Sequence, residues 1–78
     1  MELIVLSQND CAPCKVLKNF LTQEEIPFTE INLSENPDKI EHYKVMSTPV
    51  TVLEEDGEEI TRVQGFNPEQ VEELAEYL

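Results

Sequence analysis

Two cysteines separated by two residues, in the segment Cys11-Ala12-Pro13-Cys14, are the side chains of this sequence best suited to chemistry. Two thiols at this spacing at a helix start can close a disulfide within one turn, and the thiolate is the reactive species. In a reducing compartment a structural disulfide would be reduced, so such a pair is typical of redox catalysis or of metal binding. A pair of inert buried thiols is the structural alternative.

The residues on either side predict that this pair lies where a strand leads into a helix. Residues 3–6 are a continuous apolar run of strand length, and the polar residues 7–10 form the turn that follows. Pro13 suits the first turn of a helix. Apolar residues then recur at helical spacing, at Val16, Leu17, Phe20 and Leu21. A strand-to-helix junction makes the redox interpretation of the pair much stronger.

The two thiols differ in their predicted environment, and this difference predicts their roles. Cys11 lies at the helix N-terminus, where free N–H groups and the helix dipole stabilise a thiolate. Lys15 favours the thiolate and Asp10 opposes it, and the sequence leaves the balance between them open. Cys14 lies inside the first turn and is expected to be more buried. Cys11 is therefore predicted to be the nucleophile and Cys14 the resolving thiol.

The rest of the chain predicts three further strands and two further helices in one domain, residues 1–78. Strands are expected at 28–33, 49–53 and 59–64, with a hairpin turn at Asp56-Gly57. The resulting α/β order is β-α-β-α-β-β-α. The first two strands are expected to pair in parallel through a right-handed crossover, and the last two to form an antiparallel hairpin.

Helix starts and core positions follow from shorter patterns. Ser34 or Asn36 is predicted to cap the second helix, with Pro37 in its first turn. Asn67 is predicted to cap the last helix, which begins at Pro68. Two sets of residues are expected in the core, Tyr43 and Met46 around the second helix and Val71, Leu74 and Leu78 along the last one.

Charge and composition narrow the range of partners. With 17 acidic and 5 basic residues the net charge is −12, which argues against nucleic acid and against anionic membranes as partners. The N-terminal residues lack the basic region and length of a secretory signal, so we expect a cytoplasmic protein. It is expected to work as a monomer without a cofactor. Zinc usually takes four ligands, and beyond the cysteines the chain offers only His42, so any metal would be shared between two chains.

Thr48-Pro49 and Gly65 are the other positions with a possible role in the site. From the residues alone, a trans Thr48-Pro49 bond is favoured because cis bonds are rare. Gly65 either ends a strand or allows close approach of a substrate backbone. These alternatives stay open at this level.

Three motifs together resemble the glutaredoxin-like branch of the thioredoxin superfamily. They are Cys11-Ala12-Pro13-Cys14, Ser47-Thr48-Pro49-Val50 and Gly65-Phe66. The resemblance covers essentially the whole chain and implies a thioredoxin-like fold of glutaredoxin size, a four-stranded mixed sheet with three helices. It implies a cis Pro49 facing the dithiol. It also implies that the backbone of Thr48 or Val50 pairs with the substrate, with Gly65 and Phe66 nearby.

Within this branch the chain is most similar to the NrdH-redoxins, through Asn9-Asp10-Cys11 and through Gly65-Phe66 followed by Pro68. That resemblance implies reduction by thioredoxin reductase and electron transfer to ribonucleotide reductase or another disulfide-containing protein. The features expected for binding glutathione are weak, since Gln64-Gly65-Phe66-Asn67 replaces the usual Gly-Gly and Asp. Two alternatives remain, a glutathione-dependent glutaredoxin and a metal or iron–sulfur module that uses Cys11 and Cys14.

Overall fold

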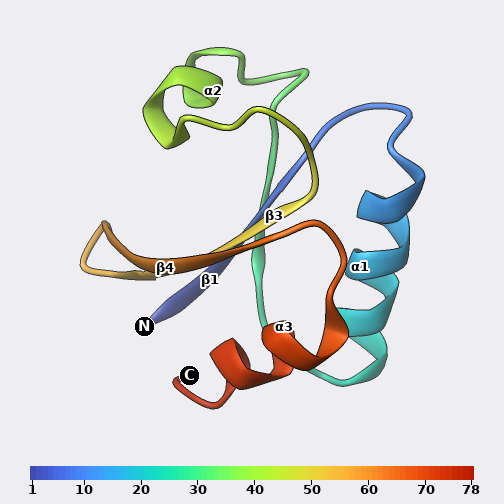
Figure 1. Ribbon diagram of the computed structural model, residues 1–78, viewed down its shortest axis with the longest axis vertical. Helices are drawn as coiled ribbons and strands as arrows, with labels where there is room; N and C mark the ends of the chain where they lie inside the picture. The colour runs from blue at the N-terminus through green and yellow to red at the C-terminus, as the bar shows by residue number, and fades with distance from the viewer.

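A four-stranded sheet with helices on both faces forms the framework of the protein, as the computed structural model of residues 1–78 shows (Figure 1). The elements follow the predicted order. They are β1 (Glu2–Ser7), α1 (Ala12–Gln23), β2 (Thr29–Asn32), α2 (Asp38–Tyr43), β3 (Val50–Glu55), β4 (Glu58–Gln64) and α3 (Pro68–Ala75). The strand order in the sheet is β2-β1-β3-β4. β2 is two residues shorter than the predicted strand at 28–33.

Strand pairing agrees with the sequence prediction. β1 and β2 are parallel, whereas β1 pairs antiparallel with β3, and β3 with β4. β1 and β3 lie in the middle of the sheet, which explains their nearly continuous burial and their runs of apolar residues. Asp56 and Gly57 both have positive φ, 54° and 83°, as a tight hairpin between β3 and β4 requires.

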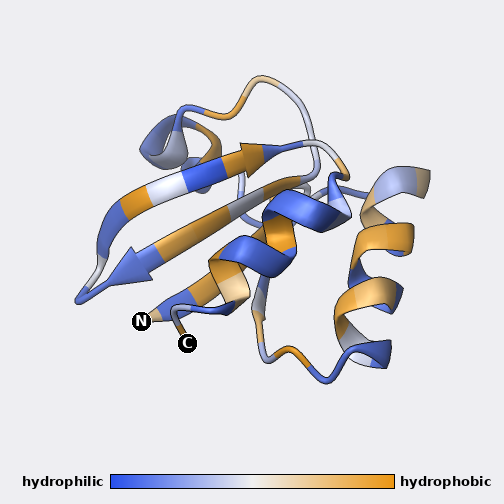
Figure 2. Ribbon diagram, turned by 60° about the horizontal axis from the view of Figure 1, so that its bottom comes forward, coloured by the Kyte–Doolittle hydropathy of each residue, from blue (hydrophilic) through white to orange (hydrophobic).

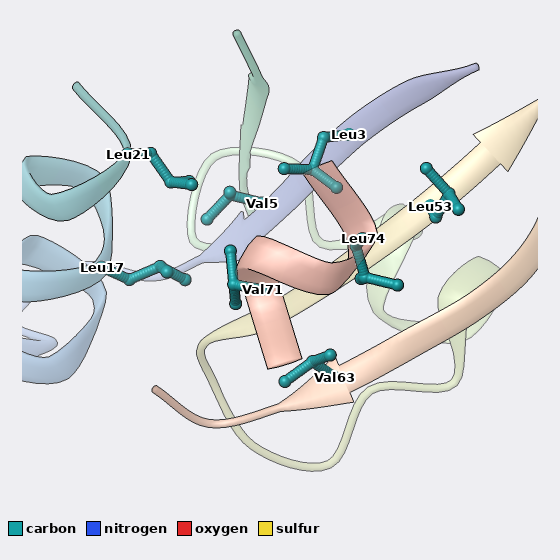
Figure 3. Close-up of a cluster of buried hydrophobic side chains, with 8 residues drawn as sticks. All are labelled: Leu3, Val5, Leu17, Leu21, Leu53, Val63, Val71 and Leu74. Carbon is teal, nitrogen blue, oxygen red and sulfur yellow. The ribbon is translucent and has the colours of Figure 1, made fainter. Parts of the chain in front are cut away.

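The first face of the sheet is covered by α1 and α3, which pack on it side by side (Figures 1 and 3). Figure 2 shows hydrophobic residues on the strands and on α1, and hydrophilic ones along much of α3. The buried cluster on this face consists of Leu3, Val5, Leu17, Leu21, Leu53, Val63, Val71 and Leu74. Because α1 is fixed along its length by Leu17 and Leu21, its first turn, which carries the cysteines, is held against the end of the sheet.

The second face carries a smaller core beneath α2. Its buried residues are Ile4, Leu6, Leu33, Tyr43, Val45, Val50 and Val52. Adjacent residues of the central strands alternate between the two cores, as the period of a strand requires. Tyr43 is buried, as predicted, and His42 is on the surface.

The capping prediction for α2 was wrong, and the reason lies in the loops. The Ser34 hydroxyl accepts a hydrogen bond from the Asn9 N–H at 3.0 Å, and the Asn36 side chain donates to the Asn32 carbonyl at 2.9 Å. α2 begins at Asp38 with no side-chain cap. These polar side chains instead fasten the loop after β2, and Ser34 ties it to the loop before α1. The cap of α3 is confirmed, since Asn67 accepts from the Gln70 N–H at 3.3 Å.

Two predicted core residues are exposed. Met46 is 97% exposed because Lys44, with a φ of 54°, ends α2 and turns the chain so that Val45 takes the buried position. Leu78 is 44% exposed because α3 ends at Ala75, so helical spacing does not extend to it. No helix of the structure is long and apolar enough to cross a membrane.

Candidate functional site

The cysteine pair lies at the N-terminus of α1, after the loop that leaves β1. Asp10 lies in the turn before the helix and has a φ of 57°, a conformation that Asp tolerates better than most residues. Cys11 is the N-cap residue of α1, and its Sγ accepts a hydrogen bond from the Cys14 N–H at 3.2 Å. The pair forms a disulfide with Cα atoms 5.3 Å apart. Sulfur therefore takes the place of the oxygen that usually caps a helix.

The two sulfurs differ in accessibility in the predicted direction. Cys11 is 7% exposed and Cys14 is 1% exposed. A molecule that approaches from solvent therefore meets Cys11 first. Because Cys11 is the N-cap residue, its sulfur also lies at the helix end where free N–H groups are found, and the Cys14 N–H donates to it.

The start of β3 and the end of β4 lie beside the cysteines because of the sheet register. Leu6 pairs with Val50, and Val50 pairs with Gln64, so the loops attached to these residues share one end of the sheet (Figure 1). The Thr48-Pro49 bond is cis, as the family resemblance implied and against the expectation from base rates. The Thr48 hydroxyl donates to Cys11 Sγ at 3.5 Å.

The backbone of Thr48 has no hydrogen-bond partner within the chain, since neither its N–H nor its carbonyl takes part in the loop hydrogen bonds. Its neighbours are fixed on both sides. The Gly65 N–H donates to the Pro49 carbonyl at 2.8 Å, and the Gln64 side chain donates to Ser47 Oγ at 2.8 Å. The site thus holds a rigid backbone edge whose N–H and carbonyl are free, next to the disulfide.

Phe66 and Val50 have packing roles in the structure. Phe66 is half-exposed, and its ring contacts that of Phe20 edge to face at a centroid distance of 5.9 Å. It links the loop after Gly65 to α1. The Val50 side chain is fully buried in the core beneath α2, so only its backbone lies at the site.

A surface pocket of about 400 Å³ opens beside the disulfide, and its lining includes Asp10, Cys11, Cys14 and Lys15. Both residues predicted to act on the pKa of Cys11 are therefore at the site. The pocket also contains two residues that the sequence analysis did not single out, Lys18 and Glu30.

Lys18 and Glu30 form an ion pair of 2.8 Å between α1 and β2. Glu30 also accepts a hydrogen bond of 2.6 Å from the buried Ser7 hydroxyl. The hydrogen bonds from Lys18 and then from Ser7 lower the pKa of Glu30. The partners are twelve residues apart in sequence, and they come from successive elements of the unit in which α1 connects the parallel strands β1 and β2. No group of three or more His, Cys, Asp or Glu side chains is placed to hold a metal ion.

The fold and the helix-terminal dithiol together define a thiol–disulfide oxidoreductase with the thioredoxin fold. The model of the thioredoxin domain family matches residues 1–77, and the chain belongs to this family.

Three known proteins illustrate its place in the family. The chain is 40% identical over 79 residues to the SPbeta prophage-derived thioredoxin-like protein YosR of Bacillus subtilis, covering 100% of this chain and 99% of that protein. It is 34% identical over 74 residues to the glutaredoxin-like protein NrdH of Lactococcus lactis, covering 91% and 96%. The structure of the NrdH-redoxin from Escherichia coli superposes with a TM-score of 0.78 at 23% identity, covering 95% of each chain.

Proposed function

We propose that this protein reduces disulfides of other proteins, with Cys11 as the nucleophile and Cys14 as the resolving thiol. The observation that carries the proposal is the pair of donors that converge on Cys11 Sγ, the Cys14 N–H at 3.2 Å and the Thr48 hydroxyl at 3.5 Å. Hydrogen bonds to an ionised acceptor stabilise it more than hydrogen bonds to a neutral one. Such donors favour the thiolate of Cys11 in the reduced protein.

The reaction proceeds in two exchange steps. The Cys11 thiolate attacks one sulfur of the substrate disulfide, forms a mixed disulfide and releases the other substrate sulfur as a thiolate. The Cys14 thiolate then attacks Cys11 Sγ, breaks the mixed disulfide and releases the second substrate thiolate. Two electrons pass to the substrate, and the protein is left with the Cys11–Cys14 disulfide.

The free backbone of Thr48 is the proposed docking edge for the substrate. An extended segment adds to an exposed backbone edge through main-chain hydrogen bonds. Pro49, Val50, Gly65 and Phe66 complete this proposed substrate-binding loop, Pro49 and Gly65 by fixing the edge and Phe66 by forming its outer side. We assign pKa modulation of Cys11 to Asp10 and Lys15, which line the pocket beside it.

The proposed electron donor is thioredoxin reductase, and ribonucleotide reductase is the proposed acceptor. Two similarities support this choice. One relative is a glutaredoxin-like protein NrdH, and the E. coli NrdH-redoxin is described as having a thioredoxin-like activity profile. The net charge of −12 disfavours glutathione, which is itself an anion. A protein that works as a reductant needs a reducing compartment, so we place it in the cytosol. We propose that it acts as a monomer.

One assay tests the donor. Insulin-disulfide reduction is measured with NADPH and thioredoxin reductase, and in parallel with NADPH, glutathione and glutathione reductase. We expect turnover with the first system. Turnover only with glutathione overturns the proposed donor and favours the glutaredoxin alternative. Turnover with neither system, in protein shown to be folded, contradicts the proposed reductase function. It favours the alternative in which Cys11 and Cys14 bind a metal shared between two chains.

A further inference from the structure

Cys14 must act as a thiolate from a buried position. It is 1% exposed, against 7% for Cys11, so its sulfur lies almost out of contact with water. Burial disfavours the charged form of a thiol and raises its pKa. The second exchange step nevertheless needs the Cys14 thiolate. The protein must therefore supply a group that stabilises a negative charge on this sulfur.

Lys18 lies one helical turn beyond Cys14 on α1. Residues four apart on a helix are neighbours on its surface, with Cβ atoms about 5–6 Å apart. Cys14 and Lys18 also line the same pocket of about 400 Å³. Cys11 has the same relation to Lys15, which follows it by one turn and lines this pocket too. Each sulfur thus has its own lysine one turn further along the helix.

The two lysines differ in how firmly they are held. Lys18 donates to Glu30 Oε2 at 2.8 Å, and the buried Ser7 hydroxyl donates to the same oxygen at 2.6 Å. Because Ser7 belongs to β1, the carboxylate that holds Lys18 is itself fixed to the central part of the sheet. The Lys15 ammonium has no ion-pair partner. Lys18 is therefore the lysine with a defined position in the pocket.

The charges around Cys14 come from three elements. Besides the two lysines of α1, Asp10 from the loop before the helix and Glu30 from β2 line the pocket. Lys18 and then Ser7 lower the pKa of Glu30, which makes its carboxylate a weak base and poorly suited to take a thiol proton. An ammonium group has three N–H donors, and Lys18 uses one hydrogen bond on Glu30. Its remaining donors are available to a negative sulfur.

We propose that Lys18 supplies the positive charge that stabilises the Cys14 thiolate in the second exchange step, and that Glu30 positions Lys18. The inference rests on the proposed function and assigns a separate lysine to each sulfur. Cys14 gives its proton to solvent through the pocket, and its thiolate attacks Cys11 Sγ. The bond between Cys11 and the substrate breaks, and the substrate sulfur leaves as a thiolate. Lys18 keeps its proton throughout and acts on resolution of the mixed disulfide, not on its formation.

A stopped-flow experiment with an uncharged aromatic disulfide observes the two steps separately. The protein is reduced with dithiothreitol, desalted and mixed with dithiodipyridine, which releases one absorbing thiopyridone in each step. The phase whose rate depends on reagent concentration reports attack by Cys11. The phase whose rate does not depend on it reports attack of Cys14 on the mixed disulfide, and its pH profile gives the kinetic pKa of Cys14. Because the reagent is uncharged, a lysine cannot act by attracting it.

Lys18→Gln should raise the kinetic pKa of Cys14 by about one unit and leave the first phase unchanged. Below that pKa the second phase should slow about threefold, because the lower thiolate fraction is partly offset by the greater nucleophilicity of a more basic thiolate. Lys18→Arg keeps the charge and should retain the wild-type profile. Lys15→Gln is the matched control with the opposite result, a slower first phase and an unchanged second one.

Glu30→Gln tests the positioning of Lys18. Without the carboxylate the lysine is no longer held in the pocket, so the shift caused by Lys18→Gln in this background should be less than about half of that in the wild type. A shift of full size in this background overturns the positioning role of Glu30.

The remaining outcomes separate the inference from the proposed function. A second-phase profile that Lys18→Gln leaves unchanged, or that Lys18→Arg shifts as far as Lys18→Gln does, overturns the role of Lys18 while the proposed function stands. Absence of the second phase in folded wild-type protein overturns the proposed function itself, because Cys14 then does not resolve the mixed disulfide.

Discussion

The two ends of strand β3 differ in whether the polar groups near them have hydrogen-bond partners within the chain. At the Val50 end, the preceding Thr48 has a backbone N–H and carbonyl without partners in the chain. At the other end, the buried Glu54 carboxylate accepts a hydrogen bond of 2.8 Å from the Tyr43 hydroxyl. Arg62 joins this network, since it donates to the Tyr43 carbonyl and to Glu59, each at 2.7 Å.

This contrast separates groups that hold the fold from groups that are available to another molecule. Buried polar groups normally find partners within the protein, because a missing partner costs about 1–3 kcal/mol. The network of Tyr43, Glu54 and Arg62 meets this requirement and adds no reactive group. The Thr48 edge stays open beside a reactive sulfur. We therefore expect changes at the network to alter stability and changes at the Thr48 end to alter reactivity.

Substitution of the cysteines has the largest expected effect, and it tests the Val50 end of β3, which lies beside the disulfide. Cys11→Ser and Cys14→Ser are both expected to abolish multiple-turnover reduction of insulin, because each removes one of the two exchange steps. Only Cys14→Ser should retain substrate as a mixed disulfide, which non-reducing mass spectrometry detects as an adduct on Cys11. An adduct on Cys14 in the Cys11→Ser variant, with none in Cys14→Ser, would reverse the assigned roles.

At the other end of β3, a substitution in the network of Tyr43, Glu54 and Arg62 is expected to change stability and not reactivity. Tyr43→Phe removes the donor to Glu54 and should lower the free energy of unfolding by about 1–2 kcal/mol, while the rate of insulin reduction stays unchanged. Urea denaturation of the oxidised protein measures the first quantity. Tyr77→Phe is the matched control, because Tyr77 is 63% exposed and its hydroxyl has no partner to lose. Equal stability of the two variants would contradict a structural role for the network.

The same tyrosine predicts a pH dependence. Burial, and then the hydrogen bond to Glu54, raises the pKa of Tyr43 from 10 to about 12. The folded protein therefore holds this proton more tightly than the unfolded chain does. The resulting stabilisation is complete below pH 10 and is lost as the pH rises from 10 to about 12. Over this range the urea midpoint should fall more steeply for the wild type than for Tyr43→Phe, and parallel curves would contradict the assignment.

Thr48→Val tests the hydroxyl at the reactive end. Loss of a donor to the thiolate should raise the pKa of Cys11 by about one unit, since a hydrogen bond to a charged group contributes roughly 1.5–3 kcal/mol at short distance and less at 3.5 Å. The pH dependence of alkylation by iodoacetamide measures this pKa in a Cys14→Ser background, where Cys11 is the only thiol. Thr48→Ser keeps the hydroxyl and should leave the pKa close to that of the parent. A shift of the same size in both variants would show that the hydroxyl is not responsible.

Much of the fold could be predicted from the sequence because its signals are local. The apolar run of β1, the Asp56-Gly57 turn and the Asn67 cap each specify their own element, and the structure confirms them. Met46 could not be placed in this way. Its exposure depends on the left-handed conformation of Lys44, which ends α2 one residue after Tyr43. A prediction based on helical spacing continues the helix past that point, whereas in the structure the helix has already ended.

The site was only partly predictable for a related reason. The cysteines are neighbours in sequence, so their spacing alone indicates the chemistry. Thr48 is 37 residues from Cys11, and its hydroxyl reaches the sulfur only because β3 pairs with β1. The family resemblance, rather than any local pattern, pointed to the cis bond before Pro49. Nothing in the sequence analysis predicted the contact of the Thr48 hydroxyl with Cys11. The ion pair of Lys18 with Glu30 has no such motif and became visible only in the structure.

The smallest expected effect concerns the two charges next to the cysteines. Asp10→Asn should lower the pKa of Cys11 and Lys15→Gln should raise it, because the first removes a repelling charge and the second an attracting one. Both side chains are exposed, so each shift should be below about one unit. The alkylation assay in the Cys14→Ser background measures both.

A measurement at high salt distinguishes the Cys11 pKa shifts caused by the two charges from the shift caused by loss of the Thr48 hydroxyl. At roughly 1 M salt the Debye length falls to about 3 Å, so the shifts caused by Asp10 and Lys15 should nearly vanish. The shift caused by Thr48→Val should persist, because a direct hydrogen bond is not screened. If the Lys15→Gln shift survives high salt unchanged, Lys15 acts through a contact with the sulfur rather than through its field. The open end of β3 would then owe its reactivity to local contacts alone.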